Sequence, residues 1–325
     1  MTTRQSRPPS TRETSTRQPR TRLAGLACPA GKPPTPAPDR SAGPGAALAT
    51  AGVAAGASAL AWVGRGCLPG GDRWERTNHR GRSLTLREGP SWASGAILAV
   101  ATSAGLTPRQ RLACTVATAA AAGLGALDDL AESGSSKGLR GHLGALARGQ
   151  LTTGGLKVIG IPVASVLAAA VLEPRRDTSR AAYAARTVLA GGIVAGSANL
   201  LNLLDLRPGR ALKAALLTAP VALTGPAPAC VQGAVAGPSL ALLPVDLGER
   251  GMLGDCGANA AGALVGMSVL LATAEAGRPQ VWRSAVFAGL LGLTLASEKV
   301  SFTAVIEATP GLRELDALGR RPSTG

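Results

Sequence analysis

Residues 112–127 read LACTVATAAAAGLGAL and contain no charge, and Asp128 and Asp129 follow them directly. Placing one carboxylate in hydrocarbon costs several kcal/mol, and two adjacent carboxylates also repel each other. Such a pair is tolerated at a membrane surface if a cation neutralises it. The pair is therefore either the polar end of a helix or half of a metal site, and choosing between these interpretations decides the function.

The composition favours a bundle of helices in a membrane. Of the 325 residues, 46% are hydrophobic but only 2% are aromatic, so Ala, Val, Leu and Gly supply nearly all of the apolar surface. Soluble cores rely on aromatic side chains for much of their burial, whereas small residues suit close helix packing in lipid. The five cysteines have no CxxC spacing, which predicts neither a disulfide framework nor a zinc site.

The net charge of +15 indicates anionic partners. The basic residues lie between apolar runs and are not interleaved with aromatic residues, so we expect no nucleic-acid partner. Anionic lipid headgroups and phosphorylated substrates explain the charge better.

The chain divides into three predicted regions. Residues 1–44 are rich in Pro, Ser, Thr and Arg and lack apolar periodicity, which predicts a disordered basic tail. A misassigned start codon is an alternative explanation of this region. Residues 45–303 form the predicted membrane domain, and residues 304–325 are predicted to be a cytoplasmic C-terminal tail.

Nine apolar runs predict an all-α, polytopic membrane protein with about nine transmembrane helices. Each run alone is a weak signal against the ~20 residues that a spanning helix needs. Their regular succession favours spans over the alternative, which is a soluble all-α protein. The runs are 45–66, 91–107, 111–130, 154–172, 185–204, 209–225, 227–244, 257–276 and 281–300.

The distribution of Lys and Arg favours one orientation of these spans. If the first span ends in the cytoplasm, the loops on that side carry more Lys and Arg than the loops opposite, as the positive-inside rule requires. The basic N-terminal region argues against this orientation. We expect a multi-pass protein of the plasma membrane whose motif-bearing loops face the cytoplasm.

Three polar segments end or begin apolar runs on this cytoplasmic face. In one of these segments Asn199, Asn202 and Asp205 follow one another at intervals of three residues, so on a helix they share one face. Carboxylates from three helix ends can converge on Mg²⁺, which commonly takes one or two carboxylates plus substrate phosphates. The candidates are Asp128 and Asp129; Asn199, Asn202 and Asp205; and Asp255.

Each candidate also has a simpler interpretation. A single Asp at a helix end is usually a solvated cap, and an Asn within an apolar helix more often bonds a neighbouring helix than a ligand. The three segments together favour a site because they lie on one predicted face of the membrane.

Four stretches follow one another in an order and spacing that resemble a known family: LGALDDLAE, KGLRGHL, NLLNLLD and MLGDCGANAAGALVG. The family is the polyprenyl-phosphate N-acetylhexosamine-1-phosphate transferases, or membrane glycosyltransferase family 4. It includes phospho-N-acetylmuramoyl-pentapeptide transferase and the UDP-GlcNAc:undecaprenyl-phosphate transferases. The resemblance covers about Arg76 to Ser301.

The resemblance implies an enzyme of cell-envelope glycan or peptidoglycan precursor synthesis. The phosphate of a polyprenyl phosphate attacks the β-phosphorus of a UDP-sugar and releases UMP, and Mg²⁺ neutralises the charge. The implied partners are the polyprenyl phosphate, the UDP-sugar and the membrane, and a homodimer is left open. The implied catalytic residues are Asp128 and Asp129, the metal ligands Asp255 and Asp129, and the substrate-binding residues Asn199, Asn202 and Asp205.

The sequence departs from the family in three places. Pro208 stands where the family's DGxDG segment has its second Asp, and Pro lacks a backbone donor. Glu132 replaces the third acid of DDxxD. The family's C-terminal histidine segment has no counterpart, because the only histidines are His79 and His142.

These departures leave a second hypothesis open. A catalytically impaired relative would bind a lipid carrier or act as a partner protein in envelope assembly. A transporter is a third interpretation, but the charges lie at span ends rather than at the bilayer midplane.

Overall fold

The computed structural model describes residues 1–2, 43–78, 81–131, 153–175, 179–275 and 280–321. The chain divides into two units, Met1–Pro38 and Asp39–Gly325, and all described helices belong to the second. The predicted tail 1–44 therefore lies almost entirely outside the described residues. Glu132, His79, His142 and the KGLRGHL stretch also lie outside them.

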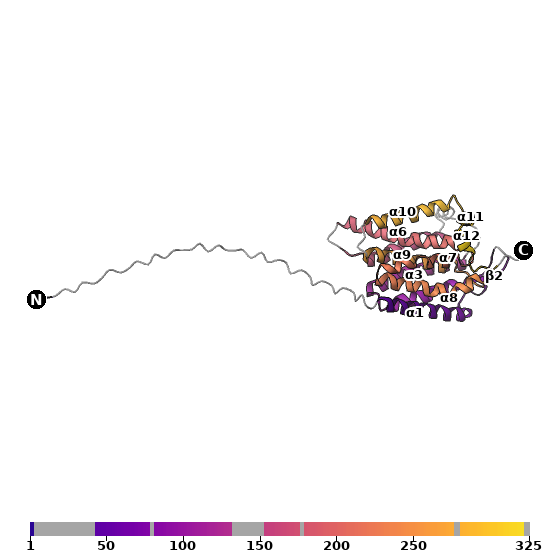
Figure 1. Ribbon diagram of the computed structural model, residues 1–325, viewed down its shortest axis with the longest axis horizontal. Coiled ribbons are helices and arrows are strands. Elements are labelled where there is room, and N and C mark those ends of the chain that lie inside the picture. Colours follow the sequence, from indigo (N-terminus) through magenta and orange to yellow (C-terminus); the bar gives the residue numbers. More distant parts are fainter. Residues whose placement is uncertain (3–42, 79–80, 132–152, 176–178, 276–279, 322–325) are drawn as a thin grey trace. The chain divides into compact units, whose positions relative to one another are not determined.

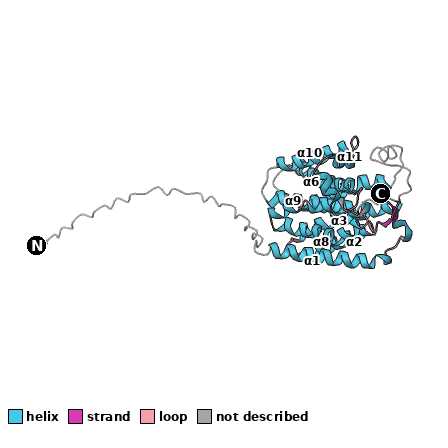
Figure 2. Cartoon of the chain, turned by 45° about the vertical axis from the view of Figure 1, so that its right-hand side comes forward, coloured by secondary structure: helices cyan, strands magenta, loops and turns pink. Residues whose placement is uncertain are grey.

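The described part of the chain is built almost wholly from α-helices, which confirms the all-α prediction (Figures 1 and 2). Short 3₁₀ helices, η2 (Gly64–Cys67), η3 (Gly71–Trp74) and η4 (Ala219–Thr224), join some of them. The α-helices are α1 (Gly43–Val63), α2 (Glu88–Thr102), α3 (Pro108–Ala131), α5 (Thr153–Leu172), α6 (Arg180–Leu204), α7 (Arg210–Leu216), α8 (Pro226–Leu247), α9 (Gly254–Glu275), α10 (Gln280–Ser297), α11 (Phe302–Ala308) and α12 (Leu312–Ala317).

Five described helices are long and apolar enough to cross a membrane, which indicates a multi-pass membrane protein. A sixth span results if α10 and α11, which are bent by 97° at their break, are counted together. Leu48 and Leu60 of α1 and Leu167 of α5 are mostly exposed, as lipid-facing side chains are. The five helices are α1 extended through η2, α5, α6, α8 and α9.

Each of the nine predicted runs contains a described helix, but not every one is a long apolar helix. Helix α2 has only 15 residues. The run 209–225 is divided between α7 and η4, because Pro220 lacks the N–H that would continue α7 and disfavours helical backbone in the residue before it.

Helix α9 is the central helix of the bundle and packs between α3 and α6 (Figure 1). A Cβ at Gly262 would lie 2.2 Å from the Ser197 carbonyl oxygen, and one at Gly125 would lie 2.2 Å from the Asp255 carbonyl oxygen. Small residues allow such close approach of helix backbones. The Ala- and Gly-rich composition therefore brings the end of α3 directly against the start of α9.

A short hairpin, which the sequence did not predict, supports the entrance to α9. Strands β1 (Glu75–Thr77) and β2 (Ser83–Thr85) pair antiparallel. The Thr85 N–H donates to the Arg250 carbonyl oxygen at 3.4 Å, and the Thr85 carbonyl oxygen accepts from the Met252 N–H at 3.0 Å. The hairpin thus holds the segment that leads into α9.

The region 304–325, predicted to be a tail, contains part of α11 and all of α12, which are bound to α7. The buried Arg210 guanidinium donates to both Asp316 oxygens at 2.8 and 3.0 Å and to Thr303 Oγ1 at 2.8 Å. Lys213 Nζ donates to the carbonyl oxygens of Leu315, Asp316 and Leu318. A bidentate arginine–carboxylate pair of this kind orients both partners, so these helices are docked.

Candidate functional site

Asp129 lies at the end of α3 and closes the N-terminus of α9. Its two carboxylate oxygens accept the backbone N–H groups of Asp255 and Cys256 at 3.0 and 2.8 Å. The first N–H groups of a helix lack partners within the helix, and the helix dipole favours a negative charge there. Gly254 makes the turn at φ +60°, and a Cβ there would lie 3.0 Å from Asp129 Oδ2. Asp129 therefore fixes the position of Asp255.

Asp128 and Asp255 share one cation, the ammonium group of Lys157 on α5. Lys157 Nζ lies 2.8 Å from Asp128 Oδ2 and also forms an ion pair with Asp255 Oδ2. The three side chains keep between 16% and 25% exposure, so a ligand can reach them. We call Asp128 and Asp255, which are bridged by Lys157, the lysine-bridged pair. It joins α3, α5 and α9 at one point.

Sequence reasoning missed Lys157, although a signal for it was present. Lys157 is the only charged residue in the apolar helix TGGLKVIGIPVASVLAAAVL. An ionisable residue within a membrane span is costly and is therefore a functional-site hypothesis by default. Lys157 lies outside the quoted motifs, and the positive-inside rule accounts for basic residues on this face without assigning any of them to a site.

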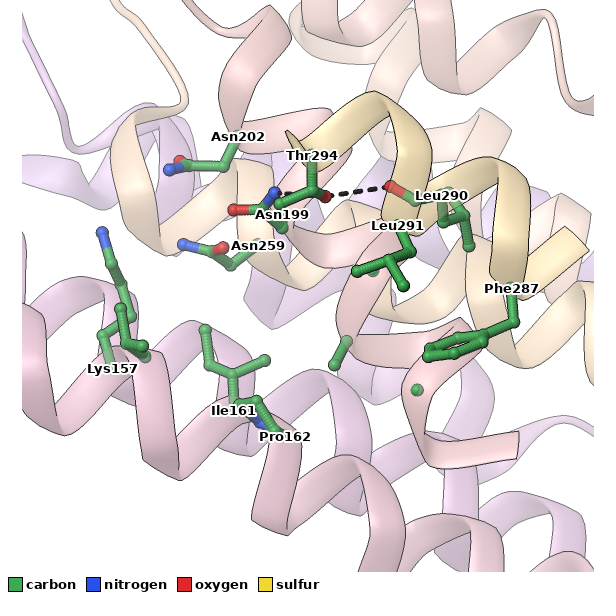
Figure 3. A pocket seen from close by; sticks show the side chains of 14 residues that line it. Lys157, Ile161, Pro162, Asn199, Asn202, Asn259, Phe287, Leu290, Leu291 and Thr294 are labelled. Atoms are coloured by element: carbon green, nitrogen blue, oxygen red, sulfur yellow. Dashed lines mark hydrogen bonds between the residues drawn. The ribbon is translucent and has the colours of Figure 1, made fainter. Parts of the chain in front are cut away.

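A cavity of about 320 Å³ opens beside Lys157, between α5, α6, α9 and α10. Figure 3 shows its polar end, where Lys157, Asn199, Asn202 and Asn259 face the same space. The opposite end is apolar, as the figure also shows; its labelled residues are Ile161, Pro162, Phe287, Leu290 and Leu291. We call this space the amphiphilic pocket.

The amides of the pocket are held in place but keep bonding capacity. Asn199 Nδ2 donates to Thr294 Oγ1 at 3.0 Å, and Asn259 Nδ2 donates to the Asp255 carbonyl oxygen at 2.7 Å. An amide has two donors and an acceptor oxygen, so both side chains retain groups for a ligand. Asn259, which directly follows the GDCGA stretch, is a second lining residue that the sequence analysis did not single out.

A second set of carboxylates, Glu88, Asp205 and Asp246, lies at the same end of the bundle, and we call it the buried acidic group. Their exposures are 0%, 4% and 2%, and each has at least one oxygen without a hydrogen-bond partner among the described residues. Burial, and then the charge of Asp246, raise the pKa of the Asp205 carboxyl well above its usual range. Burial, and then the charges of Asp246 and Asp205, do the same to the pKa of Glu88.

The predicted site residues divide between these two places. Asp205 belongs to the buried acidic group and accepts a backbone N–H bond from Gly254. Glu88 and Asp246 were not predicted, because neither lies in a motif that the sequence analysis quoted. The other predicted residues are linked to one another through Lys157, the N-terminus of α9 or the amphiphilic pocket: Asp128, Asp129, Asp255, Asn199 and Asn202.

The donor set fits a magnesium ion only in part. Among the described residues, no group of three or more His, Cys, Asp or Glu is arranged to hold a metal ion. Asp128 and Asp255 nevertheless direct one oxygen each to a single cation, and Mg²⁺ commonly takes two carboxylates together with substrate phosphates. The metal-binding role of Asp129 stays a prediction, and both of its oxygens bind backbone N–H groups.

Pro208, one of the departures from the family pattern, lies where the C-terminal helices dock. The Pro208 carbonyl oxygen accepts a hydrogen bond from Arg320 Nε at 3.1 Å. Arg207 pairs with Glu307 at 3.1 Å. The turn after Asp205 is therefore bound to α11, through Glu307, and to Arg320, which follows α12.

No model of a known protein family matches this chain, and no curated protein matches it. The family resemblance therefore rests on the quoted motifs alone.

Proposed function

We propose that this protein is a membrane sugar-1-phosphate transferase that uses Mg²⁺ and acts on a polyprenyl phosphate. The proposal rests on one observation. Two carboxylates far apart in the sequence, Asp128 and Asp255, meet a single ammonium group, Lys157, beside a pocket that is polar at one end and apolar at the other.

An amphiphilic substrate matches this pocket. A polyprenyl phosphate joins an anionic phosphate to a long apolar chain, so its phosphate suits Lys157 and the amides while its chain suits the apolar end. The volume of about 320 Å³ lies within the range of small-molecule sites, although it is at the low end of that range. The pocket would therefore take the phosphate and the first part of the chain.

The roles of the residues follow from their contacts. Asp128 and Asp255 would hold Mg²⁺ together with the phosphates, and the ion would neutralise the charge that two phosphate groups bring together. Lys157 would add a positive charge beside them. Asp129 is a positioning residue, because it orients the start of α9, and Asn199, Asn202 and Asn259 would bond polar groups of the substrates.

The architecture fits this assignment. We propose that α2, α3 and the broken α7–η4 segment complete a bundle of about nine spans. The ends that bear the carboxylates would face the cytoplasm, where a soluble nucleoside-diphosphate sugar is found. The family resemblance names this substrate as a UDP-sugar, with the plasma membrane as the location.

One observation favours a second candidate, the catalytically impaired relative. The Lys157 ammonium lies between Asp128 and Asp255 and satisfies both carboxylates without a metal ion. A protein of this kind would bind the lipid carrier without transferring a sugar.

An exchange assay separates the two candidates. Membranes that contain the protein are supplied with polyprenyl phosphate, Mg²⁺, labelled nucleoside monophosphate and a panel of nucleoside-diphosphate sugars. The transferase proposal predicts Mg²⁺-dependent entry of label into one of the sugars, and Asp255→Asn should abolish it. Full activity in Asp255→Asn would refute the metal assignment, and no exchange with any sugar would favour the second candidate.

A further inference from the structure

A groove of about 720 Å³ lies at the end of the bundle opposite the carboxylates. It is formed where α3 and α6 begin and α5 ends, whereas the lysine-bridged pair and the polar end of the amphiphilic pocket lie near the opposite termini of these helices. We call this space the basic groove. Its lining includes Arg109, Leu167, Ala170, Val171, Arg175 and Tyr183.

Arg109, on α3, is anchored to the end of α5. Its Nε and Nη2 atoms donate to the Val171 carbonyl oxygen at 3.0 and 2.8 Å. The last carbonyl groups of a helix lack partners within the helix and favour a positive charge nearby. A guanidinium has five N–H donors, so these two bonds fix the side chain and leave three donors that bind no described residue.

Arg175, which follows α5, lies over the ring of Tyr183, the only tyrosine of the chain. Its guanidinium carbon is 5.7 Å from the ring centroid, which is within the range of cation–π attraction. Tyr183 Oη donates to the Ala170 carbonyl oxygen at 3.1 Å, so the ring is fixed between α6 and α5. Arg109 and Arg175 are both exposed, and an anion in the groove can therefore reach both guanidinium groups.

Positive charge is in excess around the basic groove. The loop 173–180 reads EPRRDTSR and carries three Arg against two acids, and Arg109 adds a further positive charge. Glu173, the described acid of this loop, forms an ion pair with Arg283 and lies 3.8 Å from Arg186 Nε, so its charge is already balanced. Within the described part of the chain, no acidic residue lines the groove. The groove therefore complements an anion.

An apolar strip leads away from the basic groove along α5. Ile159, Val163 and Leu167 follow one another at intervals of four residues, which places them on one face of the helix. These residues are 41%, 53% and 59% exposed, and α5 is one of the helices that can cross a membrane. The groove at the end of the helix is thus charged, and the helix face that continues from it is apolar. A phospholipid has the same order, with a charged headgroup followed by acyl chains.

We propose that the basic groove binds the headgroup of an anionic phospholipid, in the leaflet opposite the carboxylates, with an acyl chain along the apolar strip of α5. The lipid phosphate would accept hydrogen bonds from Arg109 and Arg175, and guanidinium groups bind phosphate strongly. Basic pockets between spanning helices are sites of this kind for lipid headgroups. The inference goes beyond the proposed function and does not depend on it, because the groove lies at the other end of α3, α5 and α6.

The test is a lipid titration of the purified full-length protein in a nonionic detergent, with bound lipids counted by native mass spectrometry. The probes are dioleoyl-phosphatidylglycerol, which is anionic, and dioleoyl-phosphatidylcholine, which is zwitterionic and has the same acyl chains. We expect phosphatidylglycerol to bind at least about tenfold more tightly, because each arginine near an anionic headgroup raises the affinity about fivefold. Equal affinities for the two lipids, or no binding of phosphatidylglycerol, would overturn the inference.

Arg175→Gln is the diagnostic variant, because it removes one charge from the groove and leaves the bonds of Arg109 to α5 in place. It should weaken the binding of phosphatidylglycerol about fivefold and leave that of phosphatidylcholine unchanged. Arg180→Gln, which removes an exposed charge at the start of α6 but outside the groove, should keep the preference of the wild-type protein. The inference fails if Arg175→Gln keeps the preference or if both variants lose it equally. If Arg175→Gln does not fold, the ratio measured for the wild-type protein decides.

A competition experiment separates a lipid from a soluble phosphate, which offers the same charge without an acyl chain. Inorganic phosphate and glycerol 3-phosphate in large excess should not displace phosphatidylglycerol, because neither has a chain to lie along the apolar strip. Displacement by either compound would overturn the assignment of a lipid. These measurements need neither Mg²⁺ nor a nucleoside-diphosphate sugar, so their outcome is separate from that of the exchange assay.

Discussion

Two sets of carboxylates lie at one end of this bundle, and they differ in what neutralises them. The lysine-bridged pair has its own cation and keeps partial exposure. The buried acidic group is almost inaccessible and leaves several oxygens without partners among the described residues. Burying an unpaired charge is costly. The carboxylates of the lysine-bridged pair therefore suit the binding of a cation, whereas those of the buried acidic group suit protonation or hydrogen bonds from donor groups.

The largest expected difference between the two sets is in catalysis. Asp128→Asn should lower the exchange rate by at least about 100-fold, because it removes charge where the phosphates meet. Glu88→Gln should change the rate far less, since the charged groups that act on Glu88 are Asp246, Asp205 and Arg250 rather than the lysine-bridged pair. Both variants are measured in the labelled-nucleotide exchange assay. An equal loss of exchange rate in both variants would mean that the two sets of carboxylates do not differ in their contribution to catalysis.

Removing the bridging cation should destabilise the protein. In Lys157→Met the carboxylates of Asp128 and Asp255 face each other without an ammonium group, and we expect a loss of about 2 kcal/mol in the free energy of unfolding. Mg²⁺ should restore more stability to this variant than to the wild-type protein, because the vacated position between two carboxylates favours a divalent ion.

The measurement is thermal unfolding in detergent with and without Mg²⁺, and Lys299→Met, at an exposed position, is the control. The assignment of a cation site to Asp128 and Asp255 fails if Mg²⁺ has the same effect on Lys157→Met and on the wild-type protein.

Asp129 should contribute through the helix terminus rather than through a cation. Asp129→Ala leaves two N–H groups of α9 without acceptors and should cost about 1.5 kcal/mol in the free energy of unfolding. Chemical unfolding measures this loss, and Asp72→Ala serves as the control. Unlike Lys157→Met, this variant should not gain extra stability from Mg²⁺; such a gain would contradict the capping role.

The smallest expected effect is on how stability depends on pH. An acid in an ion pair stabilises the fold as the pH rises, whereas Glu88 should destabilise it. Burial and neighbouring carboxylates raise the pKa of Glu88, so its folded-state pKa lies above the unfolded value of about 4.3. The protonated form then favours folding, and stability is lost as the pH rises from the unfolded value through the folded pKa. Glu88→Gln should therefore stabilise the protein by about 1 kcal/mol at pH 7.

Unfolding free energies of the wild-type protein and Glu88→Gln, measured from pH 4 to pH 8, test this sign. The two curves should meet near pH 4 and separate as the pH rises. A wild-type protein that is the more stable one at pH 7 would mean that Glu88 has an ionic partner.

Particular residues show how much of the fold and of the site the sequence was able to predict. The run 112–127 and the acids that follow it were enough to predict a helix with a polar end, and α3 confirms the helix. The spacing of Asn199 and Asn202 predicted a shared helix face, and both line the amphiphilic pocket. Asp205, at the same spacing, lies elsewhere because α6 ends at Leu204 and the periodicity ends with the helix.

The sequence by itself determined the class of fold, because apolar periodicity and small residues require helices that pack closely, and it located the polar ends of those helices. Only the tertiary structure decided which polar groups meet. The contact of Lys157 with Asp128 and Asp255, and the burial of Glu88 beside Asp205 and Asp246, each depend on residues from separate helices. Small residues such as Gly125 allow helix backbones to approach closely, but the local sequence does not specify which helix will lie against them.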